Sequence, residues 1–162
     1  MDIRTAREPD APGILALAGQ VEHWFGPMVG EPGFHEAVAK QIRRGTALVG
    51  VEGDGGVVGG LLFGVKPPVY HVYWLVVAER MRGQGVGRAL LAEAERRFVC
   101  GVGQLEVVTF GADHPGAVAS GARVFYERLG FSPAEATGPG PEGGSRQVFR
   151  KGITGRGSGA VG

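Results

Sequence analysis

The part of the sequence best suited to chemistry is a glycine-spaced loop between an apolar run and a helix-forming segment. The run Trp74–Val77 precedes Gly83, Gly85 and Gly87, and Ala89-Leu90-Leu91 then favours a helix. Backbone N–H groups can converge on phosphate oxygens where no side chain intervenes, and a helix start adds N–H donors and the positive end of its dipole. The spacing indicates an anion-binding loop, although a tight turn would also account for the glycines.

The residues exclude two common phosphate-binding loops. The segment lacks the Gly-Lys-Ser/Thr ending that a triphosphate-binding loop needs for its magnesium ion. It also lacks Gly-x-Gly-x-x-Gly spacing and lies mid-chain, whereas a dinucleotide-binding loop follows the first strand. Instead, Arg82-x-x-Gly85-x-Gly87 resembles the Arg/Gln-x-x-Gly-x-Gly/Ala loop of the GNAT superfamily, the acyl-CoA-dependent N-acyltransferases.

A second segment carries the same resemblance. Ala122–Phe131 is similar to the late helix of the family, in which a tyrosine faces the coenzyme sulfur, followed by a glycine and an aromatic residue. The two motifs have the family's separation, and the match covers most of residues 1–151. One departure is Ala119, where many relatives carry asparagine. Asp113 or Ser120 is expected to replace that coenzyme contact, or the contact is absent.

The resemblance implies a binding mode for acetyl-CoA. It places the pyrophosphate on the backbone of a segment that we call the cradle, Arg82, Gly83, Gln84, Gly85, Val86, Gly87 and Arg88. Pantetheine would lie alongside Leu75, Val76 and Val77 like an extra strand, and the N–H of Leu75 or Val76 would meet the thioester oxygen as it gains charge. Tyr126 is expected to protonate the departing thiolate, whereas helical geometry alone would make it a packing residue.

The acceptor amine has to lose a proton before it attacks. An alkyl ammonium group with a pKa of about 10.4 needs about 4.6 kcal/mol to become neutral at pH 7, so a proton acceptor or a water relay is expected. Strand alternation predicts His71 and Tyr73 on one face with Leu75, which makes them candidates. The alternative for His71 is a hydrogen bond at a strand end. Glu22 and Asp113 are further candidates, and either could instead be a cap or a solvated charge.

The resemblance places acceptor recognition just after the first helix. The predicted substrate-binding residues are Glu22, Trp24, Phe25, Met28 and Asp113. Core packing is the alternative for the apolar members of this set. No clustered Cys, His and carboxylate spacing indicates a metal site, so none is expected.

Composition indicates one compact domain. The chain has 162 residues, of which 43% are hydrophobic, which is enough to bury a core. Lysine and arginine number 17 against 16 acidic residues, so neither nucleic acid nor an anionic membrane is an expected partner. No apolar stretch approaches the ~20 residues of a membrane span and no signal pattern begins the chain, so a cytoplasmic location is expected. The sequence leaves open whether the chain forms a homodimer.

Periodicity and turn residues predict the individual strands and helices, and the family resemblance implies an α/β fold of the α+β type, a GNAT-like mixed, mostly antiparallel sheet of about seven strands with helices on both faces. The family resemblance adds a gap between the strand ending at Val77 and the strand beginning near Leu105, which admits acetyl-CoA. The domain is predicted over residues 1–151, followed by a flexible Gly/Ser-rich tail over 152–162. The expected strands are 2–6, 46–52, 57–63, 69–77, 105–110, 131–134 and 146–151, and the expected helices are 11–25, 32–43, 85–98 and 115–129.

The predicted function is N-acetyl transfer from acetyl-CoA to a primary amine by direct attack in a ternary complex. One alternative is an acyl-CoA-binding sensor or interaction module without turnover. The other is an acyltransferase that uses a longer acyl group or a peptide N-terminus.

Overall fold

The computed structural model describes residues 1–154 and contains a seven-stranded sheet in the order β1-β2-β3-β4-β5-β7-β6. Every pair of neighbouring strands is antiparallel except β4 and β5, which are parallel. The predicted mixed, mostly antiparallel sheet is therefore confirmed. The strands are β1 (Asp2–Thr5), β2 (Ala47–Val51), β3 (Val57–Lys66), β4 (Val69–Val77), β5 (Gly103–Phe110), β6 (Ser132–Thr137) and β7 (Arg146–Ile153).

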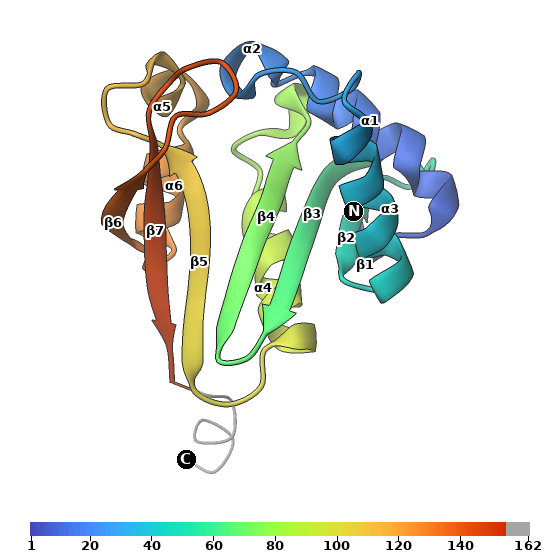
Figure 1. Cartoon of the computed structure of the whole chain (residues 1–162). Helices are drawn as coiled ribbons and strands as arrows, with labels where there is room; N and C mark the ends of the chain where they lie inside the picture. The colour runs from blue at the N-terminus through green and yellow to red at the C-terminus, as the bar shows by residue number, and fades with distance from the viewer. Residues whose placement is uncertain (155–162) are drawn as a thin grey trace.

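Helices cover both faces of the sheet (Figure 1). On one face lie α1 (Ala11–Gly19) and α3 (Pro32–Arg44), and on the other lie α4 (Val86–Phe98) and α6 (Ala122–Arg128). The short helices α2 (Glu22–Phe25) and α5 (Pro115–Ser120) lie at one end of the sheet, and two 3-10 turns, η1 (Glu8–Asp10) and η2 (Glu79–Met81), complete the fold. Within residues 1–154, no helix is long and apolar enough to cross a membrane.

The core forms on both sides of the sheet because its central strands carry apolar residues on each face. Between the sheet and α4, the fully buried side chains include Phe63, Leu90 and Leu105. Between the sheet and the first helices, Ile14 and Val38 are buried. Burying a side chain of this kind contributes about 1.5–3 kcal/mol. The two layers fix the ends of β4 and α4, from which the site is built.

The sheet opens between β4 and β5 at mid-length. The two strands pair only from Val69–Val72 with Gln104–Val107, and beyond this they separate (Figure 1). At that point β4 carries an extra residue, Tyr73, because the register with β3 passes from Leu62 opposite Trp74 to Phe63 opposite Val72. A bulge bends its strand and increases the local twist. The second half of β4 is thereby left unpaired on its β5 side, as the gap predicted from the resemblance requires.

The same bulge decides which way the β4 side chains point. Val72 and Leu75 both pack in the cluster on the α4 side, whereas Trp74 packs with the first helices. Simple alternation would put His71 and Tyr73 on the face of Leu75. Because the extra residue inverts the alternation, His71 lies on the opposite face, and the prediction of a shared face with Leu75 was wrong.

The late helix is broken in two, which periodicity did not predict. Gly121 has a φ of +69°, in the left-handed region that glycine adopts without steric cost, and it ends α5 and precedes α6. Val118, on α5, is 89% exposed. The break gives the two segments different directions, and both contact the sheet, α5 through Gly116 against Phe110 of β5.

The last strand extends past the expected domain end. In β7, Gly152 pairs with Gln104 and Ile153 pairs with Gly103, so both residues belong to the sheet and not to a tail. The rest of the expected tail, from residue 155 onward, lies outside the described residues.

Candidate functional site

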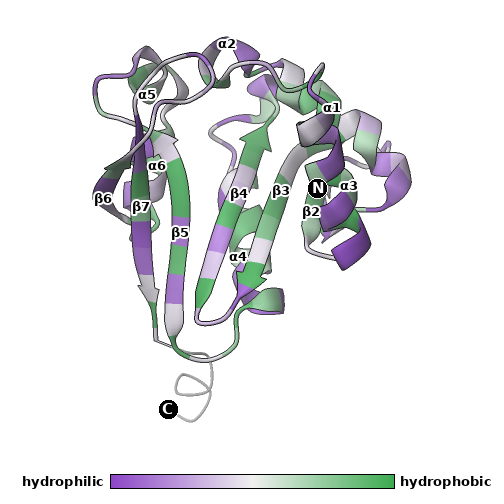
Figure 2. Ribbon diagram, viewed as in Figure 1, coloured by the Kyte–Doolittle hydropathy of each residue, from purple (hydrophilic) through white to green (hydrophobic). Residues whose placement is uncertain are grey.

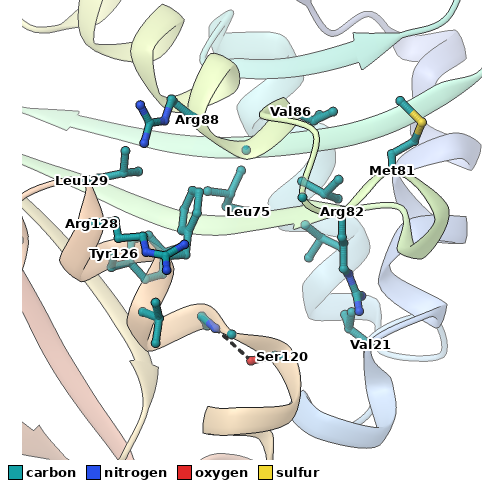
Figure 3. A pocket seen from close by; sticks show the side chains of 18 of the residues that line it. Val21, Leu75, Met81, Arg82, Val86, Arg88, Ser120, Tyr126, Arg128 and Leu129 are labelled. Atoms are coloured by element: carbon teal, nitrogen blue, oxygen red, sulfur yellow. Dashed lines mark hydrogen bonds between the residues drawn. The ribbon is translucent and has the colours of Figure 1, made fainter.

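A cavity of about 670 Å³ lies beside the unpaired half of β4 (Figure 3). This volume is within the range of small-molecule and cofactor sites. Its walls come from the end of β4, the cradle, α6 and the segment from α1 to α2. The lining residues are Val21, Trp24, Phe25, Leu75, Val76, Val77, Met81, Arg82, Gly83, Gly85, Val86, Gly87, Arg88, Ser120, Gly121, Ala122, Val124, Phe125, Tyr126, Arg128 and Leu129.

The cradle presents a row of backbone donors. Gly83 and Gly85 have φ values of +77° and +83°, so glycine is the residue that turns the chain here at least cost. The first hydrogen bond of α4 runs from the Ala89 N–H to the Gly85 carbonyl at 3.0 Å. Within residues 1–154, the N–H groups of residues 83–88 have no acceptor. Six donors at the positive end of a helix form a site for an anion.

Two cradle residues make further contacts besides their backbone donors. A Cβ on Gly87 would lie 3.1 Å from the Phe125 ring, so this glycine permits α6 to pack against α4. Gln84 does not line the cavity, and its side-chain amide donates to the Arg80 carbonyl at 3.3 Å. Gln84 therefore contributes its backbone N–H, but not its side chain, to the row of donors.

Side chains from other parts of the chain fix the η2 turn that leads into the cradle. Arg80 donates two hydrogen bonds to the Glu52 carboxylate, at 3.0 and 2.6 Å, and this pairing lowers the pKa of Glu52. The Gln20 side chain accepts the Glu79 N–H at 3.1 Å. These contacts join residues far apart in the sequence, so no local pattern indicated them.

Among residues 1–154, the charged side chains that line the cavity are three arginines, Arg82, Arg88 and Arg128. Within the described part of the chain, none of the three forms an ion pair. In Figure 3, Arg88 and Arg128 extend from α4 and α6. Arg128 was missed in the sequence, where its only signal is its place two residues after Tyr126. The lining is therefore positively charged, which suits a ligand with several phosphates.

Tyr126 lies on α6, between the core and the cavity. It is 6% exposed and packs edge-on against Phe125 and Phe131, with ring centres 5.0 and 5.4 Å away. Burial raises the pKa of its phenol above the ordinary value, so the hydroxyl stays protonated at ordinary pH. Tyr126 thus brings a neutral O–H donor to the cavity lining.

His71 and Tyr73 lie outside the cavity, on the face of the sheet opposite α4 and α6. We call this the open face, because α1 and α3 leave it uncovered over β5 and β7 (Figure 1). Their rings stack at 5.7 Å with an interplanar angle of 1°, and Tyr73 lies over Gly64 of β3. The Nδ1 atom of His71 is 3.8 Å from Oε2 of Glu106, and the other carboxylate oxygen, Oε1, accepts a hydrogen bond from Arg150 at 2.7 Å. In Figure 2, polar bands cross β4, β5 and β7. The structure therefore does not bring the two expected proton acceptors to the cavity.

The two expected acidic residues are held by other groups. Glu22 accepts the N–H groups of Met28 and Val29 at 2.5 and 2.9 Å, which lowers the pKa of its carboxyl and caps the turn after α2. Asp113 accepts a hydrogen bond from the Ser145 hydroxyl, which also lowers the pKa of its carboxyl. Neither residue lines the cavity. The alternative of a structural cap, which the sequence left open, describes Glu22.

Three of the remaining residues from the sequence can be placed directly. Trp24 and Phe25 line the cavity, whereas Met28 packs in the core beside them. Of the two substitutes considered for the missing asparagine, Ser120 lines the cavity and Asp113 does not. The Ser120 hydroxyl accepts the Ala122 N–H at 3.2 Å (Figure 3). It also donates to the Gly116 carbonyl.

A buried polar cluster fixes the position of Phe25. The Arg146 guanidinium lies over the rings of Phe25 and Phe110, 5.5 and 5.0 Å from their centres. Glu142 accepts from Arg146 at 2.7 Å and lies 3.2 Å from Nε2 of His114. Because Nδ1 of His114 accepts the Gly116 N–H, the proton of a neutral ring is on Nε2 and points to Glu142. This cluster attaches the β6–β7 connection to α2.

The fold and the sequence both have recognisable relatives. Residues 43–133, more than half of the chain, match the family model described as the acetyltransferase (GNAT) domain. No curated protein matches the chain by sequence.

Solved structures match over almost the whole chain. A ribosomal-protein-alanine N-acetyltransferase from Brucella melitensis has 24% identity and a TM-score of 0.70, with 94% of this chain and 100% of that one covered. The PaiA N-acetyltransferase from Thermoplasma acidophilum, solved with coenzyme A, has 15% identity and a TM-score of 0.71, with 94% and 98% covered. The ribosomal-protein-S18-alanine N-acetyltransferase from Escherichia coli has 20% identity and a TM-score of 0.65, with 94% of each chain covered. At these identities the likeness concerns the fold.

Proposed function

Because the chain belongs to the GNAT family of acetyltransferases, we propose that it transfers an acetyl group from acetyl-CoA to a primary amine by direct attack in a ternary complex. The observation that carries this proposal is one cavity that combines the donor row of the cradle, an unpaired strand edge and the Tyr126 hydroxyl. A binding module without turnover needs the first two features, but it has no use for a buried phenol at the reacting end.

The coenzyme is held mainly by its phosphates. The N–H groups of residues 83–88 would bind the pyrophosphate, since that row lies at the start of α4 and has no acceptor among residues 1–154. Arg88 and Arg128 would bind phosphate oxygens from the two sides of the cavity, because a guanidinium donates in a planar fork that matches them. Size, charge and donor geometry of the cavity all fit acetyl-CoA.

The unpaired edge of β4 orients the thioester. Pantetheine carries amide groups, which can continue the ladder of β4 where β5 has turned away. This places the acetyl carbonyl against the backbone N–H of Leu75 or Val76. A donor aimed at an oxygen that becomes negatively charged contributes a factor of about 10²–10³ in rate.

The transfer itself forms a C–N bond and breaks a C–S bond. The amine nitrogen attacks the carbonyl carbon, the tetrahedral oxyanion collapses, and the electron pair of the C–S bond goes to sulfur. Tyr126 donates its hydroxyl proton toward this thiolate. Since burial disfavours the phenolate, a hydrogen bond to the sulfur contributes more than complete proton transfer. The proton released by the amine leaves through water.

The test is amine-dependent release of free coenzyme thiol from acetyl-CoA. We expect thiol release to rise with the concentration of an accepted amine, and acetylated amine to appear in equal amount by mass spectrometry. Tight acetyl-CoA binding without amine-dependent release across a broad amine panel would instead support the binding-module alternative. Acyl-CoA esters of increasing chain length, assayed in parallel, decide whether acetyl is the preferred group.

A further inference from the structure

The choice of acceptor amine depends on which side chains at the cavity could take up its proton. Among residues 1–154, the titratable side chains that line it are Arg82, Arg88, Arg128 and the protonated Tyr126. None of these accepts a proton at neutral pH. The remaining residues, 155–162, include no acidic residue and no histidine in their sequence.

Two titratable side chains lie next to lining residues but do not line the cavity themselves: His23, whose ring centre is 4.3 Å from that of Trp24, and Glu127. Other acidic and imidazole groups near the lining segments are engaged elsewhere. Glu22, which follows Val21 in the chain, caps the backbone N–H groups of Met28 and Val29. The Glu142 carboxylate lies 3.2 Å from Nε2 of His114 and forms an ion pair with Arg146.

On β4, the bulge turns His71 to the open face, where its carboxylate neighbour is Glu106. The cluster around Glu106 also contains Arg150 and Glu135, which pair at 2.6 Å. Each of these groups has a structural partner, and none of them lines the cavity.

We propose that the acceptor is a weakly basic amine, the α-amino group of an amino-acyl chain, which reaches the thioester already neutral. This inference rests on the proposed function. About one α-amine in seven is neutral at pH 7, compared with about one in 2,500 lysine-type alkylamines. Without a proton acceptor beside the thioester, the α-amine should be acetylated faster than the lysine-type amine because of this difference of about 300-fold in neutral fraction. The greater nucleophilicity of the stronger base makes the difference in rate smaller than that.

The residues Val21, Trp24 and Phe25, which we call the acceptor wall, also favour this class of amine. Val21, Trp24 and Phe25 offer apolar contact to an uncharged body next to the amine. A polyamine would bring a second ammonium group, and the described lining contains no carboxylate to pair with it. The phosphates of the bound coenzyme offset the three arginines, so the preference follows from proton transfer and not from repulsion of cations.

The experiment uses the full chain and two peptides of the same sequence, Ala-Ala-Lys amide, one acetylated at the lysine side chain and the other at the N-terminus. We expect kcat/KM at pH 7 to be at least about tenfold higher for the free α-amine. For that peptide kcat/KM should rise up to about pH 8 and then level off, following the titration of the amine itself. For the lysine amine it should continue to rise through pH 9.

The variants His71→Gln and Glu106→Gln should leave both pH profiles unchanged. A limb at the same pH for both peptides would reveal a proton acceptor on the protein and overturn the proposal, and so would a preference for the lysine amine at pH 7. If neither peptide is acetylated while other amines are, the assigned acceptor class is wrong and the transferase function stands. If no amine at all accelerates thiol release, the proposed function itself fails.

Discussion

The Arg82 guanidinium lies over the indole of Trp24, with 5.1 Å between Cζ and the ring centre. One residue belongs to the cradle and the other to the acceptor wall, so the two halves of the cavity share a contact. A cation–π pair of this kind contributes about 0.5–1 kcal/mol at exposed sites. Coenzyme and acceptor binding are therefore expected to be coupled.

Replacing Trp24 tests this coupling. Trp24→Ala should raise the acceptor KM and also weaken acetyl-CoA binding by about two- to fivefold, because Arg82 loses the ring on which it rests. Isothermal titration calorimetry measures the second effect, and Trp24→Phe is the conservative control that should retain most of it. Unchanged acetyl-CoA affinity in Trp24→Ala would show that the two halves bind independently.

An anionic side chain in the cradle should abolish coenzyme binding. Gly85→Asp adds negative charge at the donor row and forces a positive φ on a residue with a side chain, and we expect at least a 100-fold loss of acetyl-CoA affinity. Gly45→Asp is the matched control, since Gly45 has a φ of +75° at the end of α3 and equally open surroundings. It should lose similar stability but no affinity. Equal losses of affinity in both variants would contradict the cradle assignment.

Removing the phenol oxygen should slow the chemical step. Tyr126→Phe keeps the ring in the core but loses the donor, so kcat should fall by roughly 10²-fold with little change in acetyl-CoA affinity. Tyr73→Phe makes the same change on the open face, where the ring stacks on His71, and should keep full activity. If Tyr126→Phe retains most of its kcat, Tyr126 is a packing residue only.

Arg128, on α6, should contribute to coenzyme binding. Arg128→Gln is expected to weaken acetyl-CoA binding roughly tenfold at low salt, because it removes a charge-assisted hydrogen bond to phosphate. The loss should shrink as ionic strength rises. Arg43→Gln, which removes a charge from α3, serves as the control. Binding to Arg128→Gln that matches the unmodified protein at every salt concentration would place the phosphates elsewhere.

Acid stability should depend on Asp10. Its carboxylate accepts hydrogen bonds from Arg4 at 2.7 and 2.9 Å and from the Arg7 N–H at 2.8 Å, and the pairing with Arg4 lowers its pKa. A lowered pKa in the folded state stabilises the protein above the ordinary aspartate value of 3.8, and this stability is lost as pH falls through the folded value. Asp10→Asn should therefore cost about 1–3 kcal/mol at pH 7.

Melting curves from pH 7 down to pH 2.5 provide the measurement. The melting temperatures of Asp10→Asn and the unmodified protein should converge only below pH 3.8, where Asp10 becomes protonated in the folded protein as well. A difference that stays constant over the whole range would mean that the charge of Asp10 does not contribute.

Local patterns in the sequence were sufficient to predict the seven strands, the positions of most helices and the glycine loop of the cradle. Apolar periodicity and turn residues depend on neighbours within a few positions, and so does the positive φ that Gly83 and Gly85 supply. The spacing Arg82-x-x-Gly85-x-Gly87 and the segment around Tyr126 indicated the family, to which the match over residues 43–133 assigns the chain.

Tertiary structure alone decided which of the expected side chains reach the cavity. The bulge at Tyr73 arises from the pairing of β4 with β3, and it turned His71 away from the site. Glu22 and Asp113 were plausible proton acceptors until the structure gave each a hydrogen-bond partner, and for Asp113 that partner, Ser145, is 32 residues away. Pairing register and long-range hydrogen bonds depend on segments that folding brings together, so no local pattern of residues contains them.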